Sequence, residues 1–170
     1  MPPINTSFTS LGTTPVAVEQ VLALFSPDAL QWKPSSWEGI PGEKFSAIEQ
    51  ICHLRDIERD GYHHRIRAVL SGSNPTLASL EGYQLATERK YKDTDVHQAI
   101  AEFKIEREKT LALLSGINDD QWDLTGYFEG YGTVTLKALV HFLCSHDQEH
   151  LASLHWLLGK MAGERVPTIA

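Results

Sequence analysis

The sequence predicts an all-α protein: a four-helix bundle in up-down-down-up order, with a long crossover between the second and third helices. Three observations support this prediction. Apolar residues recur at helical spacing in four separate segments. Clusters of glycine and proline separate these segments. The connection from 71 to 93 is long and polar, as in bundles where a crossover joins parallel neighbours.

The composition is typical of a soluble globular protein. With 170 residues, the chain fits one domain over 1–170, and we expect its core to span about 15 to 159. An apolar share of 42% with 22% charged residues excludes a disordered chain. Only two cysteines occur, which suits a reducing cytoplasm. Without a signal-like start or a long apolar run, we expect a cytoplasmic protein with no membrane partner.

The charge argues against nucleic acid as a partner. The formal net charge of -7 repels phosphate backbones unless a local basic patch overcomes it. The one basic run, which contains Arg55, Arg59, Arg65 and Arg67, is interleaved with acidic residues. We therefore interpret it as a solvated helix face.

The N-terminal part predicts an arm, a short helix and a broken connection. The first ten residues are rich in Pro, Ser and Thr, which is typical of a loose arm. Thr14 and Pro15 then form a cap and first turn for a helix over about 15 to 25. Prolines and glycines interrupt the segment from 26 to 45, where Trp32 and Trp37 are expected to pack on the bundle.

Three further helices are predicted from their start signals. Ser46 and Glu49 form a capping box for a helix from about 46 to 70. Thr94 or Asp95 caps the next, which ends near 115. After an aromatic and glycine-rich loop over 119–134, Thr135 caps the last helix, which is expected to end at Gly159.

Two histidines interrupt the apolar stripe of this last helix. At 100° per residue, His146 and His150 both lie within about 20° of Leu139. A buried imidazole needs a partner, and at i and i+4 two rings reach one metal ion. A third ligand must come from elsewhere. His53 on the second helix is favoured over His64, which lies on roughly the same face.

An alternative interpretation involves no metal. His146 and His150 are then core histidines that donate to backbone carbonyls or to Asp56 and Asp60, which is the commoner role for an isolated pair at this spacing. Of the dipeptide 63–64, one ring faces the core. The remaining residues of interest are expected on the surface, as for His97, His141 and His155, or as small buried apolar side chains, as for Cys52 and Cys144.

The order and spacing of several motifs resemble a known family. The motifs are Trp32-Lys33-Pro34, Trp37-Glu38-Gly39, Ile51-Cys52-His53-Leu54, Thr135-Leu136 and His146-Asp147-x-x-His150-Leu151. Together, over about residues 15 to 159, they resemble the DinB superfamily. The resemblance implies a four-helix bundle with a three-histidine metal site, in which His53, His146 and His150 are the ligands. It also implies a homodimer.

Three neutral imidazoles leave a divalent ion with open coordination positions, which is typical of a catalytic site. Zinc or nickel suits such a ligand set best. The loop over 119–134 is expected to form a wall of the pocket. Four nearby carboxylates are candidates to orient a ligand ring or to act as a base: Glu49, Asp56, Asp60 and Asp147.

Our leading hypothesis is a metal-dependent enzyme acting on a small-molecule substrate. It is either a hydrolase or a thiol-dependent S-transferase, with a low-molecular-weight thiol as the second substrate, because a metal activates both water and thiols. Two alternatives remain open: a non-catalytic or metal-free helical dimerisation module, and a small-ligand sensor. No catalytic residue beyond the metal set is assigned.

Overall fold

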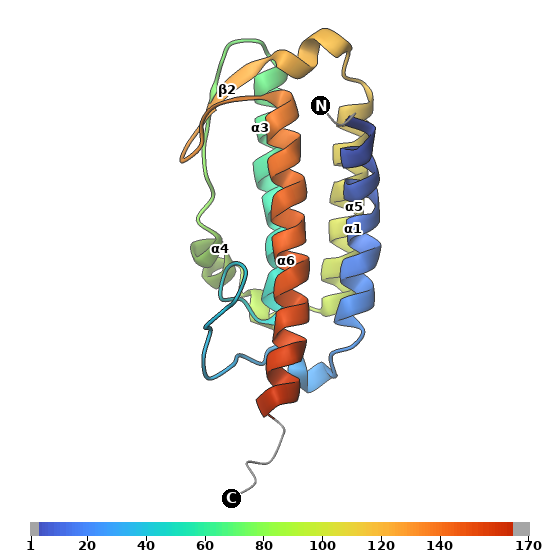
Figure 1. Ribbon diagram of the computed structural model, residues 1–170, viewed down its shortest axis with the longest axis vertical. Helices are drawn as coiled ribbons and strands as arrows, with labels where there is room; N and C mark the ends of the chain where they lie inside the picture. The colour runs from blue at the N-terminus through green and yellow to red at the C-terminus, as the bar shows by residue number, and fades with distance from the viewer. Residues whose placement is uncertain (1–3, 165–170) are drawn as a thin grey trace, which may run out of the picture.

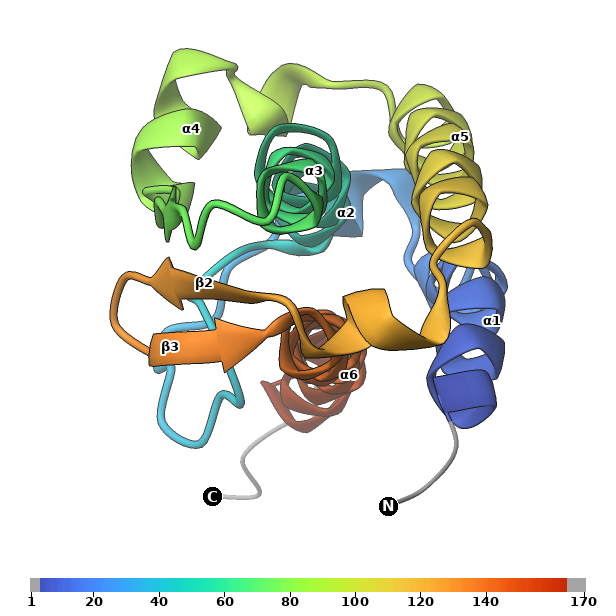
Figure 2. The same cartoon turned by 90° about the horizontal axis from the view of Figure 1, so that it is seen from above.

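The structure is a computed structural model that describes residues 4–164, and four long helical segments form a bundle (Figure 1). They are α1 (Ile4–Leu22), α2 (Ala47–Asp56) continued into α3 (His63–Leu70), α5 (Val96–Ser115) and α6 (Leu136–Glu164). Viewed along the bundle, α1 packs against both α5 and α6 (Figure 2). The α2–α3 segment also packs against both α5 and α6, on the other side of the bundle from α1. The four predicted helices are confirmed. Within 4–164, no helix combines the length and hydropathy that crossing a membrane requires.

The first helix is longer than the sequence predicts. It begins at Ile4, so the described part of the expected arm is helical, and residues 1–3 lie outside the described range. Pro15 does not start the helix but lies inside it. Proline cannot donate to the carbonyl four residues earlier, which is that of Leu11. Arg107 of α5 donates to this carbonyl instead, at 2.8 Å, which satisfies the oxygen atom that the proline leaves without its helical partner.

The second helix begins as the sequence predicts and contains one wide turn. The Ser46 amide donates to the Glu49 carboxylate at 2.8 Å, which confirms the capping box. Between α2 and α3 the backbone forms a π-helical turn, η2 (Ile57–Tyr62). Such turns are rare and are found often near functional sites. This one carries Glu58, whose side chain is buried.

The connections contain structure that the pattern of polar residues does not reveal. The crossover includes β1 (Thr76–Leu77), α4 (Gly82–Glu88) and the turn η3 (Tyr91–Asp93). The predicted loop over 119–134 is mostly a turn, η4 (Asp119–Asp123), and a hairpin of β2 (Thr125–Phe128) and β3 (Gly132–Thr135). β1 pairs in parallel with β2. The fold is therefore mostly helical with a small three-stranded sheet, and not strictly all-α.

The ends of the last helix follow the prediction only in part. Thr135 closes β3, and its hydroxyl accepts a hydrogen bond from the Ala138 amide at 3.1 Å, as a cap does. Gly159 does not end the helix, which continues to Glu164. A glycine inside a helix costs about 1 kcal/mol, and the surrounding turns outweigh that cost here.

A polar layer divides the core into two apolar halves. One half lies towards the sheet and includes Leu11, Ile57, Ile66, Leu114, Leu139 and Leu143. The other lies towards the opposite end and includes Val18, Ile48, Ile51, Phe103, Leu154 and Leu157. Along each helix the residues between these groups are buried but polar, for example Thr14, Glu58, Arg107, Asp147 and His150. Buried polar groups must be paired, so this layer requires specific partners.

Arg107 is the centre of this layer. Its guanidinium donates twice to Glu58 (2.7 and 2.7 Å), twice to Asp147 (2.7 and 3.0 Å) and once to the Leu11 carbonyl. These five bonds match the five N–H groups of the side chain. Burial alone lowers the pKa of Arg107, but the two carboxylates outweigh it and raise the pKa above its ordinary value. One side chain, only 1% exposed, thus joins all four long helical segments.

Replacing Arg107 should therefore destabilise the bundle strongly. We expect Arg107→Met to lower the free energy of unfolding by about 3–5 kcal/mol, because two carboxylates remain buried without a cation. The control is Lys104→Met on the same helix, where a partly exposed ion pair with Glu19 is lost and the change should stay below about 1 kcal/mol. Urea denaturation followed by circular dichroism measures both. Equal effects would contradict the role of Arg107.

Candidate metal centre

The structure brings the three predicted histidines together. His53 comes from α2, and His146 and His150 come from successive turns of α6. The Nε2 atom of His146 lies 3.2 Å from Nε2 of His53 and 3.1 Å from Nε2 of His150. The ring of His150 is fully buried, at 0% exposure, and that of His53 is nearly so. Three imidazole nitrogens from two helices thus meet at one point.

Glu43 joins this cluster and was not identified from the sequence. Its carboxylate oxygens lie 3.6 Å from Nε2 of His53 and 3.5 Å from Nε2 of His150. One donor atom from each of the four residues lies within 4.8 Å of the others. Glu43 belongs to the loop before α2, where no periodic pattern places a side chain. Its side chain is 32% exposed, so it covers the solvent side of the three rings.

Gln50 determines which nitrogen of His150 faces the cluster. The amide oxygen of Gln50 accepts a hydrogen bond from Nδ1 of His150, which leaves the lone pair on Nε2. The amide nitrogen of Gln50 donates to the Phe45 carbonyl at 3.2 Å and to the Glu43 carbonyl at 3.4 Å. One side chain therefore orients a ring and also holds the loop that carries Glu43.

The cluster is electrically neutral except for its carboxylate. Burial lowers the pKa of His53 to about 3 and the pKa of His146 to about 4. Burial and the two neighbouring rings also place the pKa of His150 well below its ordinary value. The rings are therefore neutral near pH 7, which is the form that binds metals. Burial and the nearby Glu149 raise the pKa of Glu43, although its own backbone amide opposes them.

These residues fit a divalent metal ion. Two nitrogens bound at 2.0–2.1 Å to a tetrahedral ion lie about 3.3 Å apart, close to the 3.1 and 3.2 Å found here. The alternative of ordinary core histidines is wrong in its stated form, since within the described structure no ring of the three bonds to a backbone carbonyl, to Asp56 or to Asp60. Nδ1 of His53 and of His146 are buried without a hydrogen-bond partner among the described residues.

The sequence as a whole matches a known family, since the family model of the DinB superfamily covers residues 10–154. The chain belongs to the DinB superfamily. Its structure is similar to that of YfiT from Bacillus subtilis, which is described as a probable metal-dependent hydrolase with an unusual four-helix bundle topology. The TM-score is 0.81 at 18% identity, over 93% of this chain and 87% of that chain. At this identity the likeness shows the fold alone. Among curated proteins, no sequence matches.

In this DinB protein the four carboxylates predicted near the site serve other purposes. Within the described structure none of them forms a hydrogen bond or an ion pair with the three histidines, although the charge of Asp56 acts on His53 and opposes the lowering of its pKa. Each pairs with a cation instead: Glu49 with Lys33, Asp56 with Arg55, Asp60 with Arg89, and Asp147 with Arg107. A helical projection shows which face a residue occupies but not which cation another helix presents to it.

Most of the remaining candidates lie where the sequence suggests. His63 is buried and bonds to the Glu106 carbonyl and the Thr110 hydroxyl, whereas His64 is exposed, as are His97, His141 and His155. Cys52 is buried as predicted, whereas Cys144 is only partly buried. Burial raises the pKa of both thiols to about 11, so both stay protonated near pH 7. The 119–134 segment lies at the end of the bundle where α6 begins (Figure 1), and none of its residues belongs to the four-residue cluster.

Two other segments enclose the ring of His53. The ring of Phe45 packs on it with a centroid separation of 5.1 Å. The first residue of α4, Gly82, approaches it so closely that a Cβ there would lie 2.7 Å from Cε1 of the imidazole. Any larger residue must therefore displace the ring or the helix.

We expect Gly82→Ala to weaken metal binding by about tenfold or more, because the added methyl group moves His53 away from the other two rings. The control is Gly159→Ala on α6, where an added Cβ meets nothing within 4 Å. Competition titration against a chromogenic chelator measures both affinities. The same affinity in both variants would show that the position of His53 does not depend on Gly82.

Proposed function

We propose that this protein is a metal-dependent hydrolase of a small molecule, with the ion held by His53, His146 and His150. The observation that carries the proposal is the convergence of three neutral Nε2 atoms, with the Glu43 carboxylate in contact on the solvent side. Membership of the DinB superfamily and the similar fold of YfiT support it. Three protein nitrogens leave coordination positions for a substrate, as catalytic sites require.

We further propose zinc or nickel as the ion. Imidazole is a ligand of intermediate softness that suits late first-row metals, and a set without thiolates disfavours Cu(I) and iron–sulfur clusters. The nearby thiols, Cys52 and Cys144, do not belong to the four-residue set.

The residues of the chain have distinct roles in this proposal. A divalent ion held by His53, His146 and His150 would lower the pKa of a water or thiol molecule and would polarise a substrate carbonyl or phosphoryl group. The Glu43 carboxylate, 3.5–3.6 Å from the Nε2 atoms of His150 and His53, is placed to accept a proton from a substrate molecule at this point. Gln50 holds the Nδ1 proton of His150, so that ring cannot turn its other nitrogen to the site. Phe45 excludes water from one side of His53.

A thiol-dependent S-transferase is the alternative reaction class. An ion held by the same three histidines would lower the pKa of a low-molecular-weight thiol, and Glu43 would then accept the thiol proton. A panel of esters, amides, phosphoesters and electrophilic acceptors, each tested with and without added thiol, separates the two classes. Turnover that requires the thiol indicates transfer, whereas turnover without it indicates hydrolysis.

Two finer features of the protein stay proposals. The chain directions visible in Figure 1 support an up-down-down-up bundle in which the crossover joins a parallel pair, α2–α3 and α5.

A homodimer is a prediction that size-exclusion chromatography tests with and without a chelator. A change in oligomeric state on chelation without turnover of any substrate would favour the non-catalytic dimerisation module.

The ligand set is tested by His150→Ala. We expect the bound metal to fall from about one ion per chain to almost none, because two imidazoles do not retain an ion against a competing chelator. His155→Ala, at an exposed position one turn further along α6, should keep the full content. Elemental analysis after dialysis gives both numbers, and unchanged metal in His150→Ala would rule out the assignment.

The role of Glu43 is tested by Glu43→Gln. On any substrate of the panel that the wild-type protein turns over, we expect the rate to fall by about 10²–10⁴ while the metal content stays near one, since the amide cannot accept the proton. Glu38→Gln, an exposed residue of the same loop, should keep the wild-type rate. A wild-type rate in Glu43→Gln would exclude this residue as the base.

A further inference from the structure

Arg65 of α3 is a buried cation without a paired counter-charge. Among the described residues, three arginines are buried: Arg55, Arg65 and Arg107. Arg55 and Arg107 each form ion pairs with carboxylates at 2.7 Å. Arg65 forms no ion pair with any described residue, although it is only 6% exposed. Burying an unpaired charge costs free energy, so an anionic partner at this position would be favourable.

Three of the five N–H groups of Arg65 have no acceptor in the described structure. Nε and Nη2 both donate to the carbonyl of Ala78, at 3.0 and 2.8 Å. A guanidinium carries five N–H groups, so both groups of Nη1 and one of Nη2 remain. The ring centroids of Tyr62 and Phe128 lie 5.1 and 4.7 Å from Cζ. Such rings attract a cation but carry no net negative charge, so they compensate the burial only in part.

The pKa values of the three buried arginines show the same contrast. Burial lowers the pKa of each, but carboxylates outweigh it at Arg55 and Arg107, whose pKa values lie above the ordinary value. At Arg65 burial prevails, and the pKa is lowered. Two tyrosines and Glu129 oppose burial there. The Glu129 carboxylate, however, accepts a hydrogen bond from the Ser79 amide at 2.9 Å and forms no ion pair with Arg65.

Arg65 also lines a small cavity of about 130 Å³. Residues of η2 and α3 form one wall of this cavity, and residues 76–80 of the crossover form the other. At about 30 Å³ for each water molecule, the space holds about four waters or one small anion. Nη1 of Arg65 lies beside Gly61, a lining residue, since a Cβ there would be 2.8 Å from this nitrogen. The unbonded N–H groups therefore lie at the cavity.

The one carboxylate that lines this cavity is already neutralised. Asp60 pairs with Arg89 at 2.6 Å and with Arg59 at 3.2 Å. His64, on the same wall, is exposed and bonds to no described residue, and even a neutral imidazole carries one N–H donor. The guanidinium of Arg65 is therefore the uncompensated charge of the cavity.

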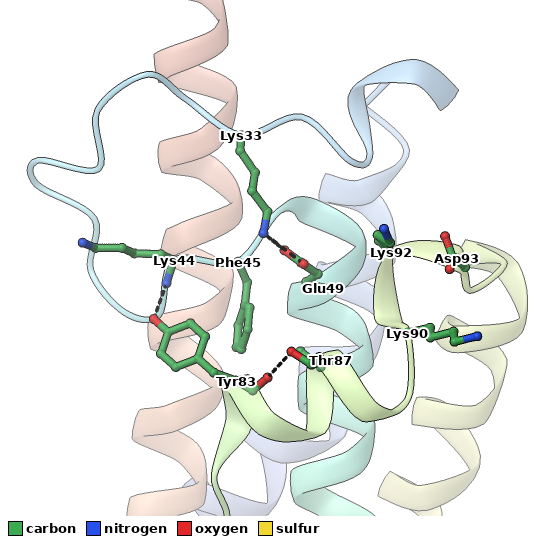
Figure 3. Close-up of a pocket in the computed structure, with 10 residues that line it drawn as sticks. Lys33, Lys44, Phe45, Glu49, Tyr83, Thr87, Lys90, Lys92 and Asp93 are labelled. Atoms are coloured by element: carbon green, nitrogen blue, oxygen red, sulfur yellow. Dashed lines mark hydrogen bonds and ion pairs between the residues drawn. The ribbon is translucent and has the colours of Figure 1, made fainter.

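A larger cavity of about 560 Å³, between α4 and the loop before α2, lacks such a group (Figure 3). Lys33 is paired there with Glu49 at 2.8 Å. Figure 3 shows Lys44 and Lys90 extending away from this cavity in opposite directions. Exposed ammonium groups are strongly hydrated and need no ligand. The buried guanidinium, and not the lysines, is thus the feature that indicates an anion site.

We propose that the cavity between α3 and residues 76–80 binds a small oxyanion, a carboxylate or a phosphate group, through Arg65. The N–H groups left on Nη1 and Nη2 form a planar fork that matches two oxygens of such a group, and His64 adds a donor. The inference goes beyond metal-dependent hydrolysis, since neither residue belongs to the four-residue set. The two sites share a segment, because Ala78 precedes Gly82, which contacts His53, by four residues.

NMR titration of the isotopically labelled, full-length protein tests this site, with inorganic phosphate in one series and acetate in another. Chelator treatment prevents either anion from binding to a metal. We expect a saturable shift of the Arg65 Nε–H signal with at least one anion, at a Kd that rises as sodium chloride is added. The group that binds more tightly identifies the preferred oxyanion.

Two variants show whether Arg65 carries the binding. In Arg65→Gln, the Kd measured from the backbone amides of residues 61–80 should rise by about tenfold or more, because the charged fork is lost. The control is Arg67→Gln, which removes the same charge from an exposed position of α3 and should change the Kd by less than about twofold. Arg65→Gln should fold, since it leaves no carboxylate without a cation, and circular dichroism checks this.

The outcomes separate this inference from the proposed function. No saturable shift with either anion in the wild-type protein overturns the inference, and this result does not depend on whether a variant folds. An equal Kd in Arg65→Gln and Arg67→Gln also overturns it. Anion binding by a chain that takes up no metal ion supports the Arg65 site and contradicts the proposed function.

Discussion

The pairing of Arg107 with Glu58 and Asp147 is the constraint on which the bundle depends. Charged groups are rarely buried, because removing each from water costs several kcal/mol unless partners compensate. Here the guanidinium satisfies two carboxylates and a carbonyl at once, with contributions from every long helical segment. The apolar halves of the core on either side favour association of the helices, whereas this pairing also requires a particular register between all four segments.

The candidate metal centre depends on the register that this network requires. Asp147 and His146 are adjacent on α6, so the bond to Arg107 also determines the rotation and height at which His146 faces α2. On the second helical segment, Glu58 lies five residues after His53, so its bonds to Arg107 help to position His53 as well. The interior thus has two connected parts, an ionic network that positions the helices and a set of neutral rings positioned by them. The convergence of the three histidines therefore depends on the packing of the whole bundle.

The helices and the histidines were predictable from the sequence, because both depend on local patterns. The periodicity of α6 is sufficient to place His146 and His150 on its buried stripe, and the capping box locates the start of α2. Glu43 was not predictable, since it lies in an irregular loop whose course depends on tertiary contacts such as those of Gln50. Pro15 was misinterpreted for the same reason, because a distant arginine satisfies the carbonyl it leaves unbonded.

The separation of the donors along the chain has a consequence for the unfolded ensemble. His53 and His146 are 93 positions apart, so an ion bound to both acts as a reversible cross-link that closes most of the chain into a ring. In the unfolded chain, binding of one ion by both histidines would cost the full entropy of ring closure. Ion binding would therefore stabilise the native state relative to the unfolded ensemble. If a bound ion stabilises the folded chain in this way, its loss would lower the abundance of the protein in a cell, because less stable chains are degraded more readily.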